Sequence, residues 1–252
     1  MVDRVELLEA LYQAMRRDKV KIEAKKFGFA VINELTAAGG TLDYGQMENN
    51  FIHKYRLLNL SADHWKKLLR GHVKQEYNAC LYFAETANNT LCFNLDNNFK
   101  INNNELIPET RLAAEFLGRH LESYGLEPLT ILSGRGYHLW CRFAKPLANQ
   151  LLLDFMIRIA AQTLASLHYS RHDYHSVKIN MSPHPQYVKG ISIRAFGSKH
   201  IKTGSFSGVK TPDGILDEEN SWDYFGKYLT NKTVSEEHFR QAYDELINKI
   251  PL

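Results

Sequence analysis

Three short segments of the chain alternate apolar and polar residues, which is the pattern of a β-strand with one buried face. The segments are residues 91–96, 137–143 and 191–196. The sides opposite their apolar residues carry polar residues, among them Asp96, His138 and Arg194. If these three faces coincide, they form a site with a carboxylate, an imidazole and a guanidinium.

The remaining periodicity predicts helices and further strands around these segments. Apolar residues at helical spacing predict a helix from Pro108 to Gly125, a second one in 151–167 and a helical acidic tail in 221–248. Residues 80–84 and 90–95 are predicted to form a hairpin around an Asn-Asn turn. This order of elements predicts an α+β fold with a mixed or antiparallel sheet core and covering helices.

The chain divides into three predicted parts. Residues 1–77 are predicted to be a small helical domain, because apolar residues recur at helical spacing in 7–15, 27–35 and 55–69. Residues 78–215 would form the sheet core, and residues 216–252 a helical C-terminal tail.

Charge and composition narrow the class of protein. The net charge is only +3 over 252 residues, but residues 168–210 hold seven Lys and Arg and five His against one acid. Such a basic block is typical of a surface that binds phosphate or nucleic acid, although a solvated face balanced by the acidic tail has the same composition. No apolar run approaches the length of about 18 residues that a membrane span needs, so no membrane association is expected.

The first residues predict an amphipathic helix and no signal peptide. Three scattered cysteines, Cys80, Cys92 and Cys141, form no C-x-x-C pair. They are expected to be buried thiols in a reducing cytoplasm.

Two other groups of residues suggest alternative sites. His168, His172 and His175 have the spacing of a zinc-binding helix face, but no matching cysteines accompany them, which favours a basic surface. Cys141 lies near His138 in sequence, yet strand alternation puts the two on opposite faces and argues against a thiol nucleophile.

In order and spacing, three motifs resemble those of the archaeo-eukaryotic primase superfamily, which includes primase-polymerases. The resemblance covers roughly residues 78–210. The motifs are Leu91-Cys92-Phe93-Asn94-Leu95-Asp96, Ser133-Gly134-Arg135-Gly136-Tyr137-His138-Leu139-Trp140 and Arg194-Ala195-Phe196-Gly197-Ser198-Lys199-His200-Ile201-Lys202-Thr203-Gly204. The last two resemble the family's Ser-Gly-x-Gly-x-His and Arg-x-Pro-Gly-Ser-x-His-x-Lys-Thr-Gly patterns.

The resemblance implies a primase-polymerase-like core and assigns roles by matching position. Asp96 and His138 would be catalytic, and Asp96 with Asn94 would hold Mg²⁺ or Mn²⁺. The nucleotide would be bound by Ser133, Arg135, His138, Arg194, Ser198, His200 and Lys202. The implied partners are a DNA or RNA template, nucleoside triphosphates and a helicase or other replication protein.

Two departures concern the acids. The family's first acid of the strand motif is Asn94 here, and Asn180 stands where the third acid is expected, with Asp173 as the only acid between 168 and 210. Two divalent ions need anionic oxygens between them to offset their repulsion, and an amide supplies oxygen without charge. The sequence therefore argues against two bound metal ions.

Two functions remain open from sequence. The first is a template-dependent nucleotidyltransferase acting in DNA replication or repair, in which a 3′-hydroxyl attacks the α-phosphate of a nucleoside triphosphate and pyrophosphate leaves. The second is a weakened or inactive primase-fold module that binds nucleotide or nucleic acid. A purely structural protein would explain neither the glycine loop nor the basic block.

Overall fold

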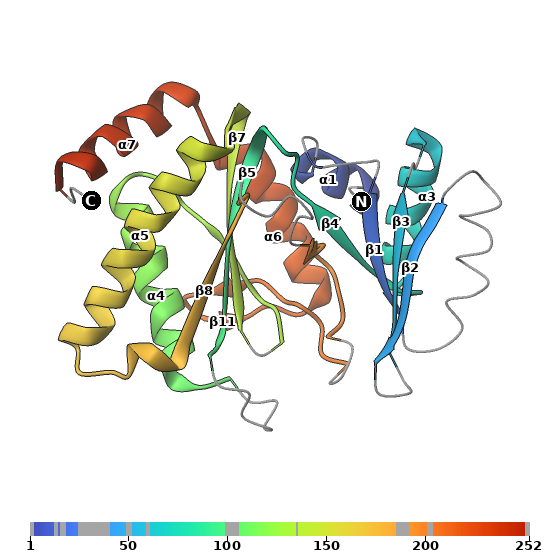
Figure 1. Ribbon diagram of the computed structural model, residues 1–252, viewed down its shortest axis with the longest axis horizontal. Coiled ribbons are helices and arrows are strands. Elements are labelled where there is room, and N and C mark those ends of the chain that lie inside the picture. Colours follow the sequence, from blue (N-terminus) through green and yellow to red (C-terminus); the bar gives the residue numbers. More distant parts are fainter. Residues whose placement is uncertain are drawn as a thin grey trace. The chain divides into compact units, whose positions relative to one another are not determined.

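The chain builds two separate five-stranded sheets and a small two-stranded one (Figure 1). This computed structural model describes residues 3–12, 15, 19–24, 41–48, 52–58, 61–98, 106–134, 136–184, 192–200 and 204–249. The chain divides into a first unit, Met1–Ala84 with Lys189–Ser207, and a second unit, Glu85–Val188 with Gly208–Leu252. The mixture of helices with largely antiparallel sheets confirms the predicted α+β class.

The first unit holds an antiparallel sheet of order β2-β3-β1-β4-β9. Its strands are β1 (Lys19–Ala24), β2 (Thr41–Glu48), β3 (Ile52–Leu58), β4 (Asn78–Tyr82) and β9 (Ser192–Arg194), and its helices are α1 (Arg4–Leu11) and α3 (Ala62–Val73).

One face of this sheet belongs to the core of the first unit. Val20 and Ile22 on β1 pair with Leu81 and Ala79 on β4, and all four side chains are buried. The helix α3 packs against β4. Its buried residues are Trp65, Leu68, Leu69, Gly71 and His72.

The prediction of a helical domain in residues 1–77 was wrong. Strands β1, β2 and β3 lie in this segment, while the helix expected in 27–35 falls outside the described residues. The error has a physical cause. Tyr55 and Leu57 lie two residues apart on β3, as alternating strand residues do, whereas Trp65 belongs to α3, so the apolar residues of 55–69 form no single helical stripe.

The predicted hairpin of residues 80–95 is also wrong. Strand β4 pairs with β1 and β9, whereas β5 (Ala87–Asn97) pairs with β7 and β8 in the other sheet. The Asn pair at its expected turn lies inside β5 and is buried, with Asn88 Nδ2 donating to Asn149 Oδ1 at 2.7 Å. A tertiary hydrogen bond thus replaces the turn that the residue types favoured.

The second unit holds a mixed sheet of order β12-β7-β5-β8, with β6 also paired to β7. Only the β12 pairing with β7 is parallel among those described. The further strands are β6 (Leu129–Leu132), β7 (Tyr137–Ala148), β8 (Val177–Ser182), β10 (Lys210–Thr211), β11 (Gly214–Ile215) and β12 (Thr233–Val234).

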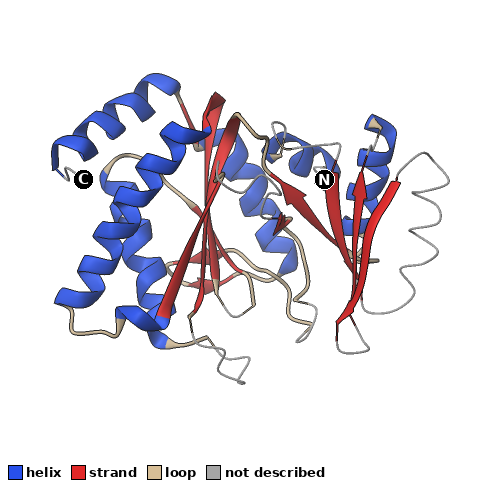
Figure 2. Cartoon of the chain, viewed as in Figure 1, coloured by secondary structure: helices blue, strands red, loops and turns tan. Residues whose placement is uncertain are grey.

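Helices cover one face of this sheet (Figure 2). They are α4 (Pro108–Ser123), α5 (Asn149–Tyr169) and α7 (Glu236–Lys249), while α6 (Glu218–Asn231) precedes β12. The core contains Leu91, Phe93 and Leu95 of β5, and all three cysteines are buried and free, as predicted. Within the described residues, α5 is the one helix long and apolar enough to span a membrane, and half of its most apolar window is buried.

Candidate functional site

The face of β5 opposite the core forms a row of polar residues with its neighbours. Asn94 on β5 pairs directly with His138 on β7 and with Asn180 on β8. Directly paired residues lie on the same side of a sheet, with Cβ atoms about 5 Å apart. The row His138–Asn94–Asn180 therefore brings an imidazole and two amides together, and Asn180 is the position where the third acid was expected.

Asp96 lies two residues further along β5, on the same face as Asn94, and pairs with Lys178 of β8. Both Asn94 and Asp96 are partly buried, and His138 is 6% exposed. The sheet alone thus accounts for the predicted proximity of Asp96 and His138, since they occupy neighbouring strands of one polar face.

The glycine loop lies against Asp96. The loop joins β6 to β7 and closes with the Ser133 N–H donating to the Gly136 carbonyl oxygen at 2.8 Å. A Cβ at Gly136 would collide with the Leu95 carbonyl oxygen and lie 3.0 Å from Asp96 Oδ1. Gly134 has φ 105°, which a side chain would strain. Local backbone geometry thus explains why glycine stands at both positions. Arg135, which lies between them, is outside the described residues.

The other predicted binding residues belong to the first unit. Arg194 ends β9 and pairs with Cys80 on β4, and its Nη1 is buried without a hydrogen-bond partner in the part of the chain that the structure describes. Ser198 is buried and donates its Oγ hydrogen to the Ala195 carbonyl oxygen at 2.6 Å. His200 is buried, and Lys202 lies outside the described residues. That these residues converge with Asp96 and His138 stays a prediction.

A clamp that sequence analysis missed holds the turn after Arg194. His72 Nε2 donates to the Phe196 carbonyl oxygen at 2.8 Å, and the Gln75 amide donates to the Gly197 carbonyl oxygen at 2.6 Å. Asn78 bonds Lys199 twice, donating to its carbonyl oxygen at 2.7 Å and accepting from its N–H at 3.2 Å. In the sequence these are only ordinary polar residues, with His72 in the last turn of α3, Gln75 just after it and Asn78 at the start of β4.

The tautomer of His72 follows from its two partners. The Ala79 N–H donates to Nδ1 at 3.2 Å, so the ring proton stands on Nε2 and is donated to Phe196. Burial lowers the pKa of His72 and keeps the imidazole neutral.

The predicted metal centre does not fit the residues present. Within the described residues there is no group of three or more His, Cys, Asp or Glu side chains that could hold a metal ion. On the polar face of the sheet, Asn94 and Asn180 contribute no charge, and Lys178 stands opposite Asp96. A two-ion centre therefore lacks the carboxylates that would hold it.

The three histidines with zinc-like spacing are likewise in no metal-ligating group of the described residues. His168 ends α5, and His175 lies in a 3-10 turn. Their rings contact tyrosines instead: His168 packs edge-on to Tyr174 with centroids 5.6 Å apart, and Tyr174 lies 4.0 Å from His175.

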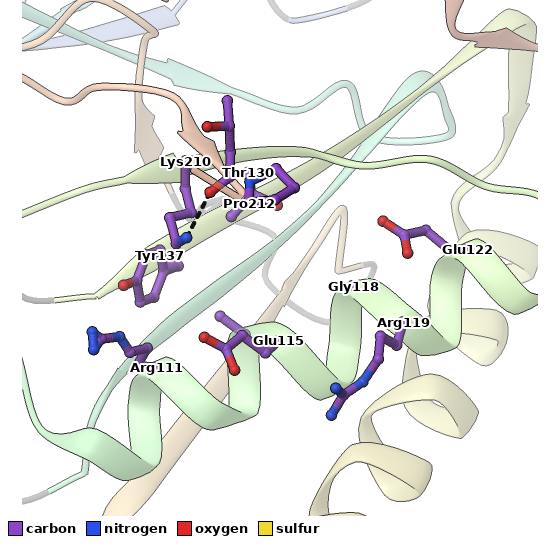
Figure 3. Close-up of a pocket in the computed structure, with 11 residues that line it drawn as sticks. Arg111, Glu115, Gly118, Arg119, Glu122, Thr130, Tyr137, Lys210 and Pro212 are labelled. Atoms are coloured by element: carbon purple, nitrogen blue, oxygen red, sulfur yellow. Dashed lines mark hydrogen bonds between the residues drawn. The ribbon is translucent and has the colours of Figure 1, made fainter. Parts of the chain in front are cut away.

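A cavity of about 470 Å³ lies on the other side of the second unit's sheet, between α4 and the strands β6 and β10 (Figure 3). Tyr137, which lines it, belongs to the core face of β7, whereas its neighbour His138 belongs to the polar face. Burial raises the pKa of Tyr137, with Arg111 acting against this and Glu115 adding to it. The cavity is thus separate from the predicted site.

Comparison with known proteins finds likeness among solved structures. No family model matches the chain, and no curated protein matches it. Among solved structures, the polymerase domain of ligase D from Mycobacterium tuberculosis, in complex with DNA, is similar with a TM-score of 0.45 and 14% identity. The match covers 98% of this chain and 87% of that chain.

Proposed function

We propose that the chain is a primase-polymerase-like module that binds a nucleoside triphosphate or nucleic acid on the polar face of the β12-β7-β5-β8 sheet, with nucleotidyl transfer weak or lost. The observation that carries the proposal is the register row His138–Asn94–Asn180, in which amides stand at both positions where acids were expected. Asp96 beside Gly136 completes the arrangement.

The chemistry of these groups suits binding better than transfer. An imidazole, two amides and a glycine loop offer hydrogen-bond donors and acceptors to a phosphate or a base. Lys178 opposite Asp96 adds a positive charge that favours a phosphate. A single carboxylate leaves little negative charge to hold two divalent ions while a phosphoryl group is transferred.

Isothermal titration with a nucleoside triphosphate tests the binding. His138→Ala should weaken the affinity about tenfold, because a hydrogen bond to a charged phosphate is worth about 1.5 kcal/mol or more. The matched control is His168→Ala, which removes an exposed imidazole at the end of α5 and should leave the affinity unchanged. Equal affinities of the wild type and His138→Ala would refute the site.

Primer extension with Mn²⁺ separates binding from turnover. The unaltered chain should extend a primer weakly or not at all, and Asn94→Asp with Asn180→Asp should raise the rate. Extension by the unaltered chain at the same rate as the double variant would instead establish the template-dependent nucleotidyltransferase. Such a result would show that Asp96 alone suffices.

A further inference from the structure

The cavity between α4 and the strands β6 and β10 is lined by charges of both signs (Figure 3). Arg111 and Glu115 stand four residues apart on the exposed side of α4, a spacing at which opposite charges commonly pair. Neither side chain makes an ion pair or a hydrogen bond with any residue that the structure describes. Both charges are therefore available to a ligand in the cavity.

A tyrosine hydroxyl lies at the same end of the cavity. The Tyr137 side chain is 3% exposed, and its hydroxyl forms no hydrogen bond within the described part of the chain. Arg111 and Glu115 both act electrostatically on this hydroxyl, and both extend from α4 toward it in Figure 3. Burial raises the pKa of Tyr137, so the hydroxyl stays protonated and can donate. A donor in a buried side chain without an acceptor favours a bound partner.

Lys210 adds a second cation from the opposite wall of the cavity. Its Nζ donates to the Thr211 carbonyl oxygen at 2.6 Å, and because an ammonium group carries three hydrogens, further donors remain. An anionic group in the cavity can thus meet donors from Arg111, Tyr137 and Lys210. The Glu115 carboxylate repels a polyanion, however, and calls for a positive group beside the negative one.

Small side chains line the cavity next to these charges. Ala114 and Gly118 are four residues apart on α4, and Gly118 lies on the side of the helix that faces the cavity in Figure 3. A Cβ at Gly118 would meet only the Leu139 side chain, at 3.9 Å, so the space beyond it is open. Thr130 and Pro212 line the other wall. The volume of about 470 Å³ falls in the range of about 300–1,000 Å³ that is typical of small-molecule sites.

We propose that this cavity binds a free α-amino acid with an apolar side chain. The α-carboxylate accepts hydrogen bonds from Arg111 and the Tyr137 hydroxyl, and the α-ammonium group donates to Glu115. The apolar side chain lies over the small residues of α4. A zwitterion satisfies charges of both signs, whereas a phosphate compound leaves the carboxylate of the cavity facing a second anion. Because the cavity and His138 lie on opposite sides of the sheet, this site does not depend on the proposed function.

Isothermal titration of the full chain with L-leucine tests the site. L-leucine should bind to the wild type, and Arg111→Gln and Glu115→Gln should each weaken the affinity about tenfold, because each removes a charge-assisted hydrogen bond to the ligand. Gly118→Leu should abolish binding, since its side chain occupies the cavity. Thermal melting of Gly118→Leu shows that it folds, as expected for a residue that gains helix propensity without a clash at its Cβ.

Two analogues of the ligand assign each charge to its partner. L-leucinamide lacks the carboxylate, and N-acetyl-L-leucine lacks the ammonium group, so the wild type should bind each about tenfold more weakly than L-leucine. Arg111→Gln should bind L-leucinamide as tightly as the wild type does, because the contact that the variant lacks is already missing. Glu115→Gln should behave in the same way toward N-acetyl-L-leucine.

The matched controls remove the same charges elsewhere in the second unit. Arg171→Gln lies in the turn after α5, and Glu237→Gln lies on α7, both at exposed positions outside the lining of the cavity. Both variants should bind L-leucine with wild-type affinity.

Three results would overturn the proposal. The first is no binding of L-leucine to the wild type, and the second is wild-type affinity in Arg111→Gln, Glu115→Gln or Gly118→Leu. The third is equal affinity of the wild type for L-leucine and its two analogues. None of these titrations contains a nucleotide, so the amino-acid site can fail while the nucleotide site stands, and the reverse.

Discussion

Replacing Gly136 by alanine tests the packing of the glycine loop on the central strand. The added Cβ would meet the carbonyl oxygen of Leu95 and come within 3.0 Å of Asp96 Oδ1. Strand β5 is hydrogen-bonded to β7 on one side and β8 on the other, so the carbonyl cannot move away without breaking ladder bonds. Overpacking lowers the free energy of unfolding by about 1–3 kcal/mol. Because the neighbouring carbonyl cannot move, we expect Gly136→Ala to lose about 3 kcal/mol.

Gly118→Ala is the matched control, with the same chemical change and the opposite expected sign. Gly118 lies inside α4, and its Cβ would meet only the Leu139 side chain, at 3.9 Å. Alanine in a helix interior is about 1 kcal/mol more stable than glycine. The two variants should therefore differ by about 4 kcal/mol in free energy of unfolding, measured by urea denaturation.

The same pair reports on binding. Gly136→Ala displaces the loop from Asp96 and should weaken nucleotide binding at temperatures where the variant stays folded, while Gly118→Ala should not. A Gly136→Ala variant as stable as the wild type would refute the reasoning. It would show that the loop can accommodate a Cβ despite the short contact distances.

Three further substitutions test single contacts by denaturation. Because burial lowers the pKa of His72, the folded state binds fewer protons than the unfolded one, so stability should fall as pH drops below about 6.5. His72→Gln should weaken that dependence, and the remainder should come in part from His120, whose pKa is also lowered by burial. Tyr228→Phe should cost about 1–2 kcal/mol, since the buried hydroxyl donates to the Trp140 carbonyl oxygen at 3.0 Å, whereas Tyr224→Phe, at a 41% exposed ring, should cost nothing. Arg171→Gly should stabilise the chain by about 1 kcal/mol, because Arg171 has φ 60° after α5. An unchanged pH profile in His72→Gln, equal losses in the two tyrosine variants, or a less stable Arg171→Gly would contradict the respective argument.

The second unit could be predicted well because its elements follow local rules. Alternation in 91–96 and 137–143 placed the core and polar faces of β5 and β7 correctly, and Pro108 and Gly125 bounded α4 as expected. The register between Asn94 and Asn180 could not be predicted. Nothing in either strand specifies which residues pair, and pairing depends on how the intervening helices return the chain.

The first unit was mispredicted because short strands and helices share apolar residue types. The order of strands β2-β3-β1-β4-β9 joins β4 to β9, residues more than a hundred apart, and no local pattern records such a pairing. The clamp by His72 and Asn78 depends on the same long-range pairing, so its residues looked like ordinary polar positions.

The amides at Asn94 and Asn180 determine whether the polar face is stable without a metal. Two carboxylates about 5 Å apart would repel by about 3 kcal/mol at an effective dielectric constant of about 20. Amides remove that repulsion, so this sheet needs no cation to hold its strands together. In the presence of a chelator, the double variant Asn94→Asp with Asn180→Asp should therefore have a lower melting temperature than the wild type. Mn²⁺ should restore the melting temperature of the double variant, whereas neither chelator nor Mn²⁺ should change that of the wild type. If Mn²⁺ does not change the melting temperature of the double variant, the two positions do not share a cation. The row His138–Asn94–Asn180 would then not be the place of a former metal site.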